Sequence, residues 1–310
     1  MKNFAITGGA GYIGSNLAKI LVKKGHSVTI FDVVPKNKAK RLYPIIHEIK
    51  YKSLDIKNLK LLKRKLKNFD VVAHFAASAD IALGQSRTDI DLKEGTIATY
   101  NVLEAMRENK ISKIIFPSSS TIYGDFTKIP TPEDTGLLFP TSLYGASKLA
   151  SEGLISAFSY LFNFKSWIFR FGNVVGKDMT RGVIKDFIIK LNKNPSKLQV
   201  LGNGNQKKDF IYIDDCINGI LFSLRKSNDT VNVFNLGTGM TTSVKKIARW
   251  IINEMNIKNV KITFTVGKSG WPGDAPIVHY NINKIRKLGW KPRLNSDEAV
   301  KIAIKDLLKK

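Results

Sequence analysis

The sequence predicts an α/β fold in which a doubly wound parallel sheet is joined to a smaller α/β domain. In the first half of the chain, short apolar runs alternate with helical patterns, and a glycine-rich turn joins the first run to the first helix. The alternation ends after about Gly172, where glycine and asparagine turns become common. Strand–helix alternation is typical of a parallel sheet with helices on both faces.

The alternation begins with the apolar run Phe4-Ala5-Ile6, which we expect to be the first strand. Behind it, Ile13, Leu17 and Leu21 recur at helical spacing and predict an amphipathic helix. Crossovers in such sheets are right-handed, and ligands bind beyond the carboxyl ends of the strands. We expect strands near residues 4–6, 28–31, 71–75, 113–116 and 166–170, and helices near 12–24, 57–67, 92–109 and 141–162.

The second part of the chain has a different rhythm. Strand-like runs at 198–201 and 210–213 lie among glycine and asparagine turns, and an amphipathic pattern near 296–309 predicts a closing helix. We therefore place the first domain at 1–172, with segments near 207–236 returning to it. The second domain spans 173–310 and is interleaved with the first.

The composition is that of a soluble globular protein, with 43% apolar and 24% charged residues among 310. No stretch approaches the ~20 apolar residues that span a bilayer, and the chain begins with a strand-like run rather than a leader. A single cysteine, Cys216, excludes an internal disulfide and fits a reducing compartment. We expect a cytoplasmic protein with no membrane partner.

The formal net charge of +25 raises the question of nucleic acid as a partner. The lysines are spread throughout, however, and no stripe interleaves them with aromatic residues. The densest stretch, 57–67, has the pattern of an amphipathic surface helix. We do not expect a nucleic-acid partner, although a positive field would help to attract an anionic substrate.

The glycine-rich turn fits two dinucleotide patterns, one through Gly9, Gly11 and Gly14 and one through Gly8, Gly11 and Gly14. Glycines allow a tight turn and let backbone amides approach a pyrophosphate at a helix N-terminus. Asp32 ends the second strand-like run, where a carboxylate binds ribose hydroxyls and repels a 2′-phosphate. The carboxylate favours NAD over NADP. The basic residues after Asp32, however, keep NADP as an alternative.

Two further segments fit a bound dinucleotide. Asp55 is placed to meet the adenine, with a helix N-cap as the alternative. The small residues of Phe75-Ala76-Ala77 follow the expected fourth strand, where the chain must pass close to a cofactor.

Tyr144 and Lys148 form a candidate catalytic pair because residues four apart on a helix share one face. A phenol has a pKa near ~10, and a cation beside it favours the phenolate. The pair could make a general base near neutral pH. Because Tyr-x-x-x-Lys is common by chance, the motif gains its weight from the cofactor motifs around it.

Together these motifs resemble the extended short-chain dehydrogenases, the NAD-dependent nucleotide-sugar epimerase/dehydratase family. The likeness covers nearly the whole chain and, within the family, is strongest to UDP-glucose 4-epimerases. Besides the glycine turn and the Tyr144/Lys148 pair, it includes His74-Phe75-Ala76-Ala77, Asn101, the segments 118–124, 170–176 and 206–215, and Gly273-Asp274-Ala275-Pro276.

The resemblance implies a Rossmann-type sheet that binds NAD and a second domain that binds a UDP-sugar. The implied reaction interconverts UDP-galactose and UDP-glucose through a 4-keto sugar, with NAD staying bound. Tyr144 would be the base, Ser119 its hydrogen-bonding partner at the sugar oxygen, and Lys148 the cation that holds the phenolate. A homodimer formed through the helices near 92–109 and 141–162 is also implied.

The family's motifs map onto this chain residue by residue, and no metal ligands are implied. The resemblance assigns NAD to Gly8, Gly11, Tyr12, Ile13, Gly14, Asp32, Asp55, Ile56, Phe75, Ala76, Ala77, Asn101, Ser118, Tyr144 and Lys148. It assigns the substrate to Ser119, Ser120, Tyr144, Asn173, Arg181, Val183, Gln199, Leu201, Lys208, Trp271, Asp274 and Val278.

Ser120 and Thr121 follow Ser119, where the related dehydratases carry Asp-Glu. Hydroxyls do not readily protonate a leaving hydroxyl group, so simple epimerisation fits better than elimination. The alternatives are another nucleotide-sugar epimerase of the family and, in a different class, a non-catalytic dinucleotide- or nucleic-acid-binding protein.

Lys208 and Trp271 stand where many members of the family carry arginines that grip the diphosphate. A lysine offers a point charge rather than a fork, and tryptophan offers no charge. Arg181 and Lys268 could supply the missing charge or be ordinary surface cations. A small residue at Val278 would leave room for an N-acetyl group, so we expect N-acetylated sugars to be accepted too.

Overall fold

The computed structural model describes residues 1–78, 80–125, 128–270 and 273–309, and its chain divides into two compact units. We refer to them as the first and the second unit. The first is formed by Met1–Ile122, Ser142–Arg170 and Ile220–Phe234, and the second by Tyr123–Thr141, Phe171–Gly219 and Asn235–Lys310.

The units differ from the expected domain boundaries at residues 123–141, which the sequence pattern assigns to the first domain, and at 207–219, which stay in the second unit because only 220–234 return. In the structure, Thr131 forms a bridge with Tyr280, and its carbonyl accepts a hydrogen bond of 2.9 Å from the Asn235 side chain. Tyr123 donates to the same Asn235 side chain at 2.6 Å. These bonds to residues far along the chain hold the segment in the second unit.

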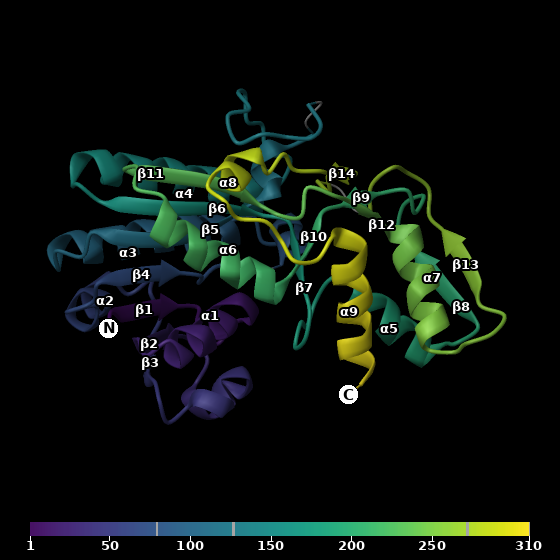
Figure 1. The fold of residues 1–310 in the computed structure, drawn as a ribbon, viewed down its shortest axis with the longest axis horizontal. Helices are drawn as coiled ribbons and strands as arrows, with labels where there is room; N and C mark the ends of the chain where they lie inside the picture. Colours follow the sequence, from purple (N-terminus) through teal and green to yellow (C-terminus); the bar gives the residue numbers. More distant parts are fainter. Residues whose placement is uncertain (79, 126–127, 271–272, 310) are drawn as a thin grey trace. The chain divides into compact units, whose positions relative to one another are not determined.

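The first unit is built on a seven-stranded sheet with the order β11-β6-β5-β4-β1-β2-β3 (Figure 1). The pairs β1–β2, β1–β4, β2–β3 and β4–β5 are parallel. The doubly wound α/β prediction is therefore confirmed. The strands are β1 (Asn3–Thr7), β2 (Ser27–Asp32), β3 (Lys50–Ser53), β4 (Val71–His74), β5 (Lys113–Ser119), β6 (Lys165–Phe171) and β11 (Val231–Leu236).

Helices α2 (Leu59–Lys65), α3 (Ala98–Glu108) and α4 (Leu143–Leu161) cover one face of this sheet. Their apolar side chains share a buried cluster with alternate strand residues, such as Ala5 and Val72. On a strand, the neighbouring residues point to the opposite face. There, buried Phe4 and Val71 meet helix α1 (Tyr12–Lys23) and the 220–226 part of α6 (Ile213–Lys226).

Two local features of this unit depart from the sequence-based expectation. The helix expected at 92–109 begins with a π-helical turn, Leu92–Ile97, before α3. Inside that turn a Cβ on Gly95 would lie 2.1 Å from the Ser147 hydroxyl, so only glycine allows the close approach of α4. The edge strand β3 was not expected, because its sequence, Lys-Tyr-Lys-Ser, has no apolar alternation.

The second unit combines three small sheets with four whole helices and the first half of α6 in its described residues. The sheets are β10–β7, β12–β9–β14 and β13–β8. The strands are β7 (Asn173–Val175), β8 (Lys197–Val200), β9 (Lys207–Lys208), β10 (Phe210–Tyr212), β12 (Thr242–Ser243), β13 (Lys261–Phe264) and β14 (Ile277–Val278), and the helices are α5 (Val183–Lys193), α7 (Val244–Glu254), α8 (Asn283–Lys287) and α9 (Ser296–Leu308).

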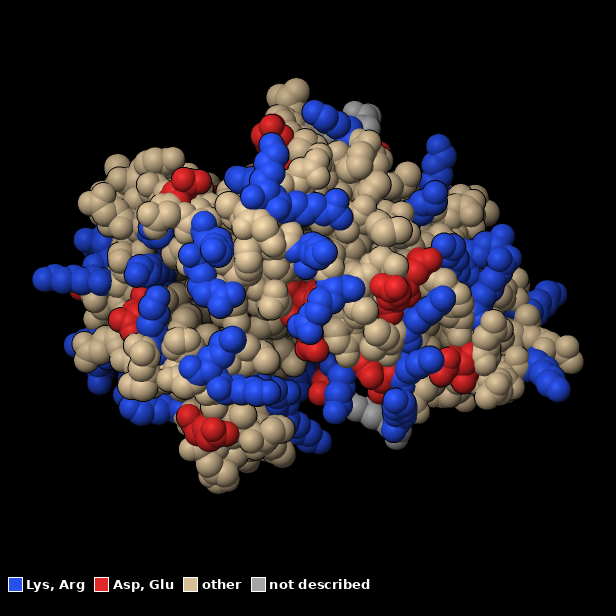
Figure 2. All heavy atoms as spheres, in the orientation of Figure 1, with Lys and Arg blue, Asp and Glu red and all other residues tan. Residues whose placement is uncertain are grey.

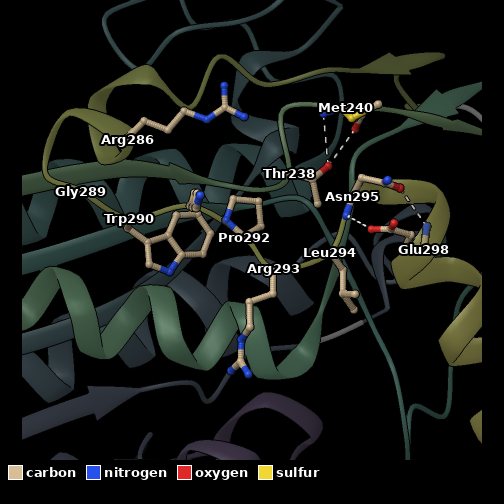
Figure 3. A pocket seen from close by; sticks show the side chains of 11 residues that line it. Thr238, Met240, Arg286, Gly289, Trp290, Pro292, Arg293, Leu294, Asn295 and Glu298 are labelled. Carbon is tan, nitrogen blue, oxygen red and sulfur yellow. Dashed lines mark hydrogen bonds between the residues drawn. The ribbon is translucent and has the colours of Figure 1, made fainter.

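The closing helix, expected at 296–309, is α9. The Asn295 side chain accepts a bond of 3.0 Å from the Glu298 amide, while the Glu298 carboxylate accepts one of 2.8 Å from the Asn295 amide. This reciprocal cap satisfies two backbone donors that a helix N-terminus otherwise leaves open. Figure 3 shows both bonds at the edge of a pocket in this unit.

We predict that Gly8→Ala will destabilise the protein more than Gly25→Ala does. Both glycines have positive φ, +67° and +75°, which costs an alanine about 1–2 kcal/mol. Only at position 8 would the new Cβ meet backbone, 2.5 Å from the Ala76 nitrogen, which adds roughly 1–3 kcal/mol of overpacking. Urea unfolding of the two variants measures the difference, and equal losses would contradict the close approach.

Candidate active site

The glycine turn lies between β1 and α1 in the first unit, and its backbone is tightly packed. A Cβ on Gly14 would lie 2.6 Å from the Gly8 carbonyl oxygen. Gly11 is the N-cap of α1 and provides no side-chain cap. The N-terminus of α1 thus has no capping side chain at the position where a helix binds a pyrophosphate.

Asp32 ends β2 and holds this turn in place. Its buried carboxylate accepts hydrogen bonds from the amides of Ala10, at 2.9 Å, and Val34, at 3.0 Å. The ribose-binding prediction for Asp32 thus gains a second, structural role for the same carboxylate. Both roles depend on the position of Asp32 at the carboxyl end of β2.

Asn101 on α3 braces the loop that contains Asp55 and Ile56. Its amide group donates to the carbonyls of Ile56, at 3.1 Å, and Lys57, at 3.0 Å. The N-cap of α2 is Asn58, which accepts a bond from the Leu61 amide, so the capping alternative for Asp55 is wrong. The Asp55 carboxylate instead accepts a bond of 2.9 Å from the Lys57 amide.

A buried polar chain supports the loop after β4, which contains Phe75, Ala76 and Ala77. The Thr7 hydroxyl lies 2.7 Å from His74 Nδ1, and His74 Nε2 lies 3.1 Å from the Thr99 hydroxyl. Burial, with the charge of Lys148 adding to it, lowers the pKa of His74 to about 3. His74 is therefore a neutral positioning group, a role that the sequence motif did not reveal.

Lys148 lies on the second turn of α4 and is 5% exposed. Its ammonium donates a bond of 2.8 Å to the Pro117 carbonyl and lies 4.6 Å from the centre of the Phe116 ring. Burial lowers the pKa of Lys148 to about 8, although the negative charges of Glu152 and Asp91 oppose this shift. The group is thus a cation that can lose its proton close to neutral pH.

Tyr144 lies one turn before Lys148, whose ammonium is 5.7 Å from the centre of the tyrosine ring. Burial, with the negative charge of Asp91 adding to it, raises the pKa of Tyr144 to about 12. The expectation that the pair by itself lowers this pKa is therefore wrong. The ammonium is directed to the Pro117 carbonyl, and desolvation outweighs its attraction for a phenolate.

The serines at the end of β5 have different surroundings. Ser118 Oγ is buried and has no hydrogen-bond partner among the described residues. Ser119 Oγ accepts bonds from the Thr121 amide, at 3.2 Å, and the Thr121 hydroxyl, at 3.0 Å. Because the Ser119 oxygen is the acceptor in both bonds, its own proton can be donated to another oxygen. Ser120 begins the short helical turn Ser120–Tyr123.

Asp91 is a charged group of this site that the sequence did not single out. It is 2% exposed, and its Oδ2 has no hydrogen-bond partner in the part of the chain that the structure describes. The Ser147 hydroxyl donates to its backbone carbonyl at 2.7 Å, which ties it to α4. Burial raises the pKa of Asp91, and Lys148 opposes the rise. No local motif marks this residue.

The remaining predicted substrate residues belong to the second unit, where Lys208 and Asp274 are paired. Lys208 Nζ lies 2.6 Å from Asp274 Oδ1 and also donates to the Ala275 carbonyl. The two side chains are only 10% and 9% exposed. The charge of Lys208 is balanced inside the unit, so its contacts do not support the point charge that we expected to face a diphosphate.

Val278 is buried beside this pair, because it is the β-ladder partner of Lys208. Asn173, Arg181, Gln199 and Leu201 are exposed, and Val183 begins α5. Trp271 lies outside the described residues. Of the predicted substrate residues that the structure describes, none lines the pocket of about 530 Å³ beside Trp290 and Arg293 (Figure 3).

A metal site and a membrane-spanning helix are two other features that the described residues could contain. No cluster of His, Cys, Asp and Glu there could hold a metal ion. No helix in the described ranges has both the length and the apolar character needed to cross a membrane.

Residues 4–237 match the model of the NAD dependent epimerase/dehydratase family. The chain belongs to this family. The match includes the glycine turn, the serines at the end of β5 and the Tyr144/Lys148 pair, so the resemblance seen in the sequence is confirmed. Members of this family are enzymes that use NAD as their cofactor.

The chain is similar to relatives over nearly its whole length. A protein of Methanocaldococcus jannaschii named "Putative UDP-glucose 4-epimerase" is 31% identical, covering 96% of this chain and 95% of its own. UDP-glucuronate 4-epimerase 4 of Arabidopsis thaliana is 27% identical, covering 96% and 73%. A crystal structure of a UDP-galactose 4-epimerase superposes with a TM-score of 0.89 at 32% identity, covering 99% of both chains.

We predict that Asp91→Asn will lower the pKa of Tyr144 in the NAD-free protein, because it removes a negative charge that opposes the phenolate. Tyrosinate absorbance during a pH titration, corrected with the same titration of Tyr144→Phe, isolates this residue. Tyr51 is the internal control, because burial and Asp32 raise its pKa to about 12 independently of Asp91. An unchanged pKa of Tyr144 would show that desolvation alone sets its value.

Proposed function

We propose that this protein is a UDP-hexose 4-epimerase that interconverts UDP-galactose and UDP-glucose with tightly bound NAD. The observation that supports this most directly is the arrangement at the carboxyl ends of β1, β2 and β5. There the glycine turn, Asp32 and Ser119 lie in one unit with Tyr144 and Lys148. Family membership and the epimerases among its relatives support the reaction class.

The first unit fits NAD by its own geometry. Gly8 and Gly14 allow the turn to pack tightly against backbone where any Cβ would collide, and the first turn of α1 behind it has no side-chain cap. The buried hydroxyl of Ser118, which has no hydrogen-bond partner in the described ranges of the chain, could give a polar contact at the end of β5. We assign the pyrophosphate to Gly8, Gly11, Tyr12, Ile13 and Gly14. The remaining contacts are assigned to Asp32, Asp55, Ile56, Phe75, Ala76, Ala77, Asn101, Ser118, Tyr144 and Lys148.

The chemistry follows from the protonation states of the chain's own groups. Tyr144 removes the proton from the sugar O4, and Ser119 donates a hydrogen bond to the same oxygen. NAD, when bound, accepts the C4 hydride and places a positive charge beside the phenol. Because Lys148 alone leaves the pKa of Tyr144 high, we infer that this second cation is needed to form the phenolate. After the keto sugar turns over, C4 would take back the hydride on its other face as Tyr144 returns the proton to O4.

The surroundings of Ser119 favour epimerisation over dehydration. Ser120 and Thr121 are the residues that follow it, and the Thr121 hydroxyl is already bonded to Ser119. No carboxylic acid is placed there to protonate a leaving hydroxyl. Another nucleotide-sugar epimerase activity remains the alternative, and the internally paired Lys208 is the observation that favours it.

We carry the family's UDP-sugar contacts over to this chain residue by residue. Ser119, Ser120 and Tyr144 belong to the first unit, where the reaction takes place. Arg181 and Lys268 are exposed, and we propose them as candidates for the diphosphate charge. The other proposed contacts are Asn173, Val183, Gln199, Leu201, Trp271, Asp274 and Val278.

We expect the purified protein to convert UDP-galactose to UDP-glucose without added NAD, since the cofactor is regenerated in each cycle. Tyr144→Phe removes the base and will lower kcat by about 10²–10⁴-fold. Tyr160→Phe, on the same helix but 70% exposed, is the matched control and leaves the rate unchanged. Chromatographic product analysis measures both rates, and equal activity of the two variants would refute the assignment.

Val278 is a small residue, and we propose that it leaves room for an N-acetyl group on the sugar. Parallel incubation with UDP-N-acetylglucosamine tests this extension in the same assay. Turnover of UDP-glucose with none of the N-acetylated sugar would reject it while leaving the epimerase proposal intact.

We propose a homodimer formed through α3 and α4 and a cytoplasmic location. Ile97, before α3, is 43% exposed, and Leu161, on α4, is 72% exposed. Leu92, Tyr100 and Tyr160 on the same elements are also exposed, and the proposed dimer would cover these apolar side chains. Leu161→Glu should halve the mass measured by sedimentation, whereas Ile189→Glu on α5 should not. A wild-type monomer would exclude this interface.

A further inference from the structure

A hollow of about 490 Å³ lies in the first unit at the amino ends of the strands. Lys2 precedes β1, Lys113 begins β5 and Lys165 begins β6, and all three line it. The cofactor loops follow the carboxyl ends of the same strands. Because β5 runs from Lys113 to Ser119 at about 3.3 Å per residue, the hollow is about 20 Å from Ser119.

The fully charged side chains that line this hollow are all basic in the described part of the chain. Six basic side chains line it, and no carboxylate does so among the described residues. On the face shown in Figure 2, by contrast, acidic residues are scattered among the basic ones. The hollow therefore concentrates charge of one sign beyond the general basicity of the chain. The six residues are Lys2, Lys24, Lys113, Lys165, Arg225 and Lys226.

The floor of the hollow is apolar and closely packed. Phe4, Leu21, Val71 and Trp167 are buried in it, and the ring nitrogen of Trp167 is bonded to the Ser227 hydroxyl at 2.9 Å. An apolar floor with a few charged groups around it is the usual composition of a small-molecule site.

His26 lines this hollow, and the positive charges around it affect its pKa. Its ring packs edge-on against Phe4 with a centroid distance of 5.3 Å. Burial lowers the pKa of His26, and the positive charges of the Met1 amino group, Lys2 and Lys24 lower it further. A bound anion would offset this repulsion and raise the pKa of His26.

We propose that this hollow binds a small, multiply phosphorylated anion at a site separate from the cofactor and the sugar nucleotide. Several cations around a concave, partly apolar surface attract phosphate groups over a distance and bind them without competing acids. The apolar floor accommodates an organic body attached to the phosphates. The inference does not depend on the proposed epimerase activity.

The test uses the NAD-bound protein, inorganic tripolyphosphate and ATP at about 0.15 M salt. Calorimetry gives Kd, and NMR follows the ring protons of His26, one of only four histidines in the chain. We expect submillimolar binding and an upward shift of the His26 pKa with both probes. Tighter binding of ATP would show that the organic body contacts the floor, whereas equal Kd values would restrict the site to the phosphates.

A pair of double variants locates the binding. Lys24→Gln with Lys226→Gln removes two exposed cations of the hollow and should raise Kd at least about fivefold. Lys193→Gln with Lys258→Gln removes the same charge from exposed positions elsewhere and should change Kd less than about twofold. An equal effect of both pairs, an unmoved His26 signal on binding, or no binding at millimolar concentration would overturn the proposal.

Discussion

The burial of the Lys148 ammonium constrains much of the first unit. A buried cation is costly unless it is paired and hydrogen-bonded, and here the Pro117 carbonyl, the Phe116 ring and the charges of Asp91 and Glu152 surround it. Burial keeps His74 neutral, and the same charge adds to this effect and opposes the rise in the pKa of Asp91. Because these contacts come from β4, β5, α4 and the turn before α3, the ammonium ties the strand ends to the helix that bears Tyr144.

Local chemistry made much of the fold and part of the site predictable. The glycine turn could be recognised because it contains Gly8, whose positive φ and close approach to Ala76 exclude other residues. The alternation of apolar runs and helices predicted the parallel sheet, since buried parallel strands are short and apolar. Tyr144 and Lys148 are four residues apart, and this spacing alone puts them on the same face of a helix. Each of these signals lies within a few residues of the feature it predicts.

The rest depends on partners that are distant in the sequence. The raised pKa of Tyr144 reflects burial and Asp91, and nothing beside Tyr144 in the sequence announces either. Lys208 could be recognised as a departure from the family pattern, but its pairing with Asp274, 66 residues away, could not. The polar edge strand β3 joins the sheet only because β2 offers it unpaired backbone groups. Tertiary context decided all three.

The chain passes between the two units five times, after Ile122, Thr141, Arg170, Gly219 and Phe234. Neither unit is therefore complete until the ribosome has made most of the polypeptide. A chain that stopped after Gly219 would lack β11 and expose the backbone donors and acceptors of β6, its neighbour in the sheet. Such an open edge invites pairing with other nascent chains. Because residues 220–234 belong to the first unit but are synthesised late, the edge of β6 stays open until they emerge from the ribosome. During that interval the nascent chain is exposed to aggregation.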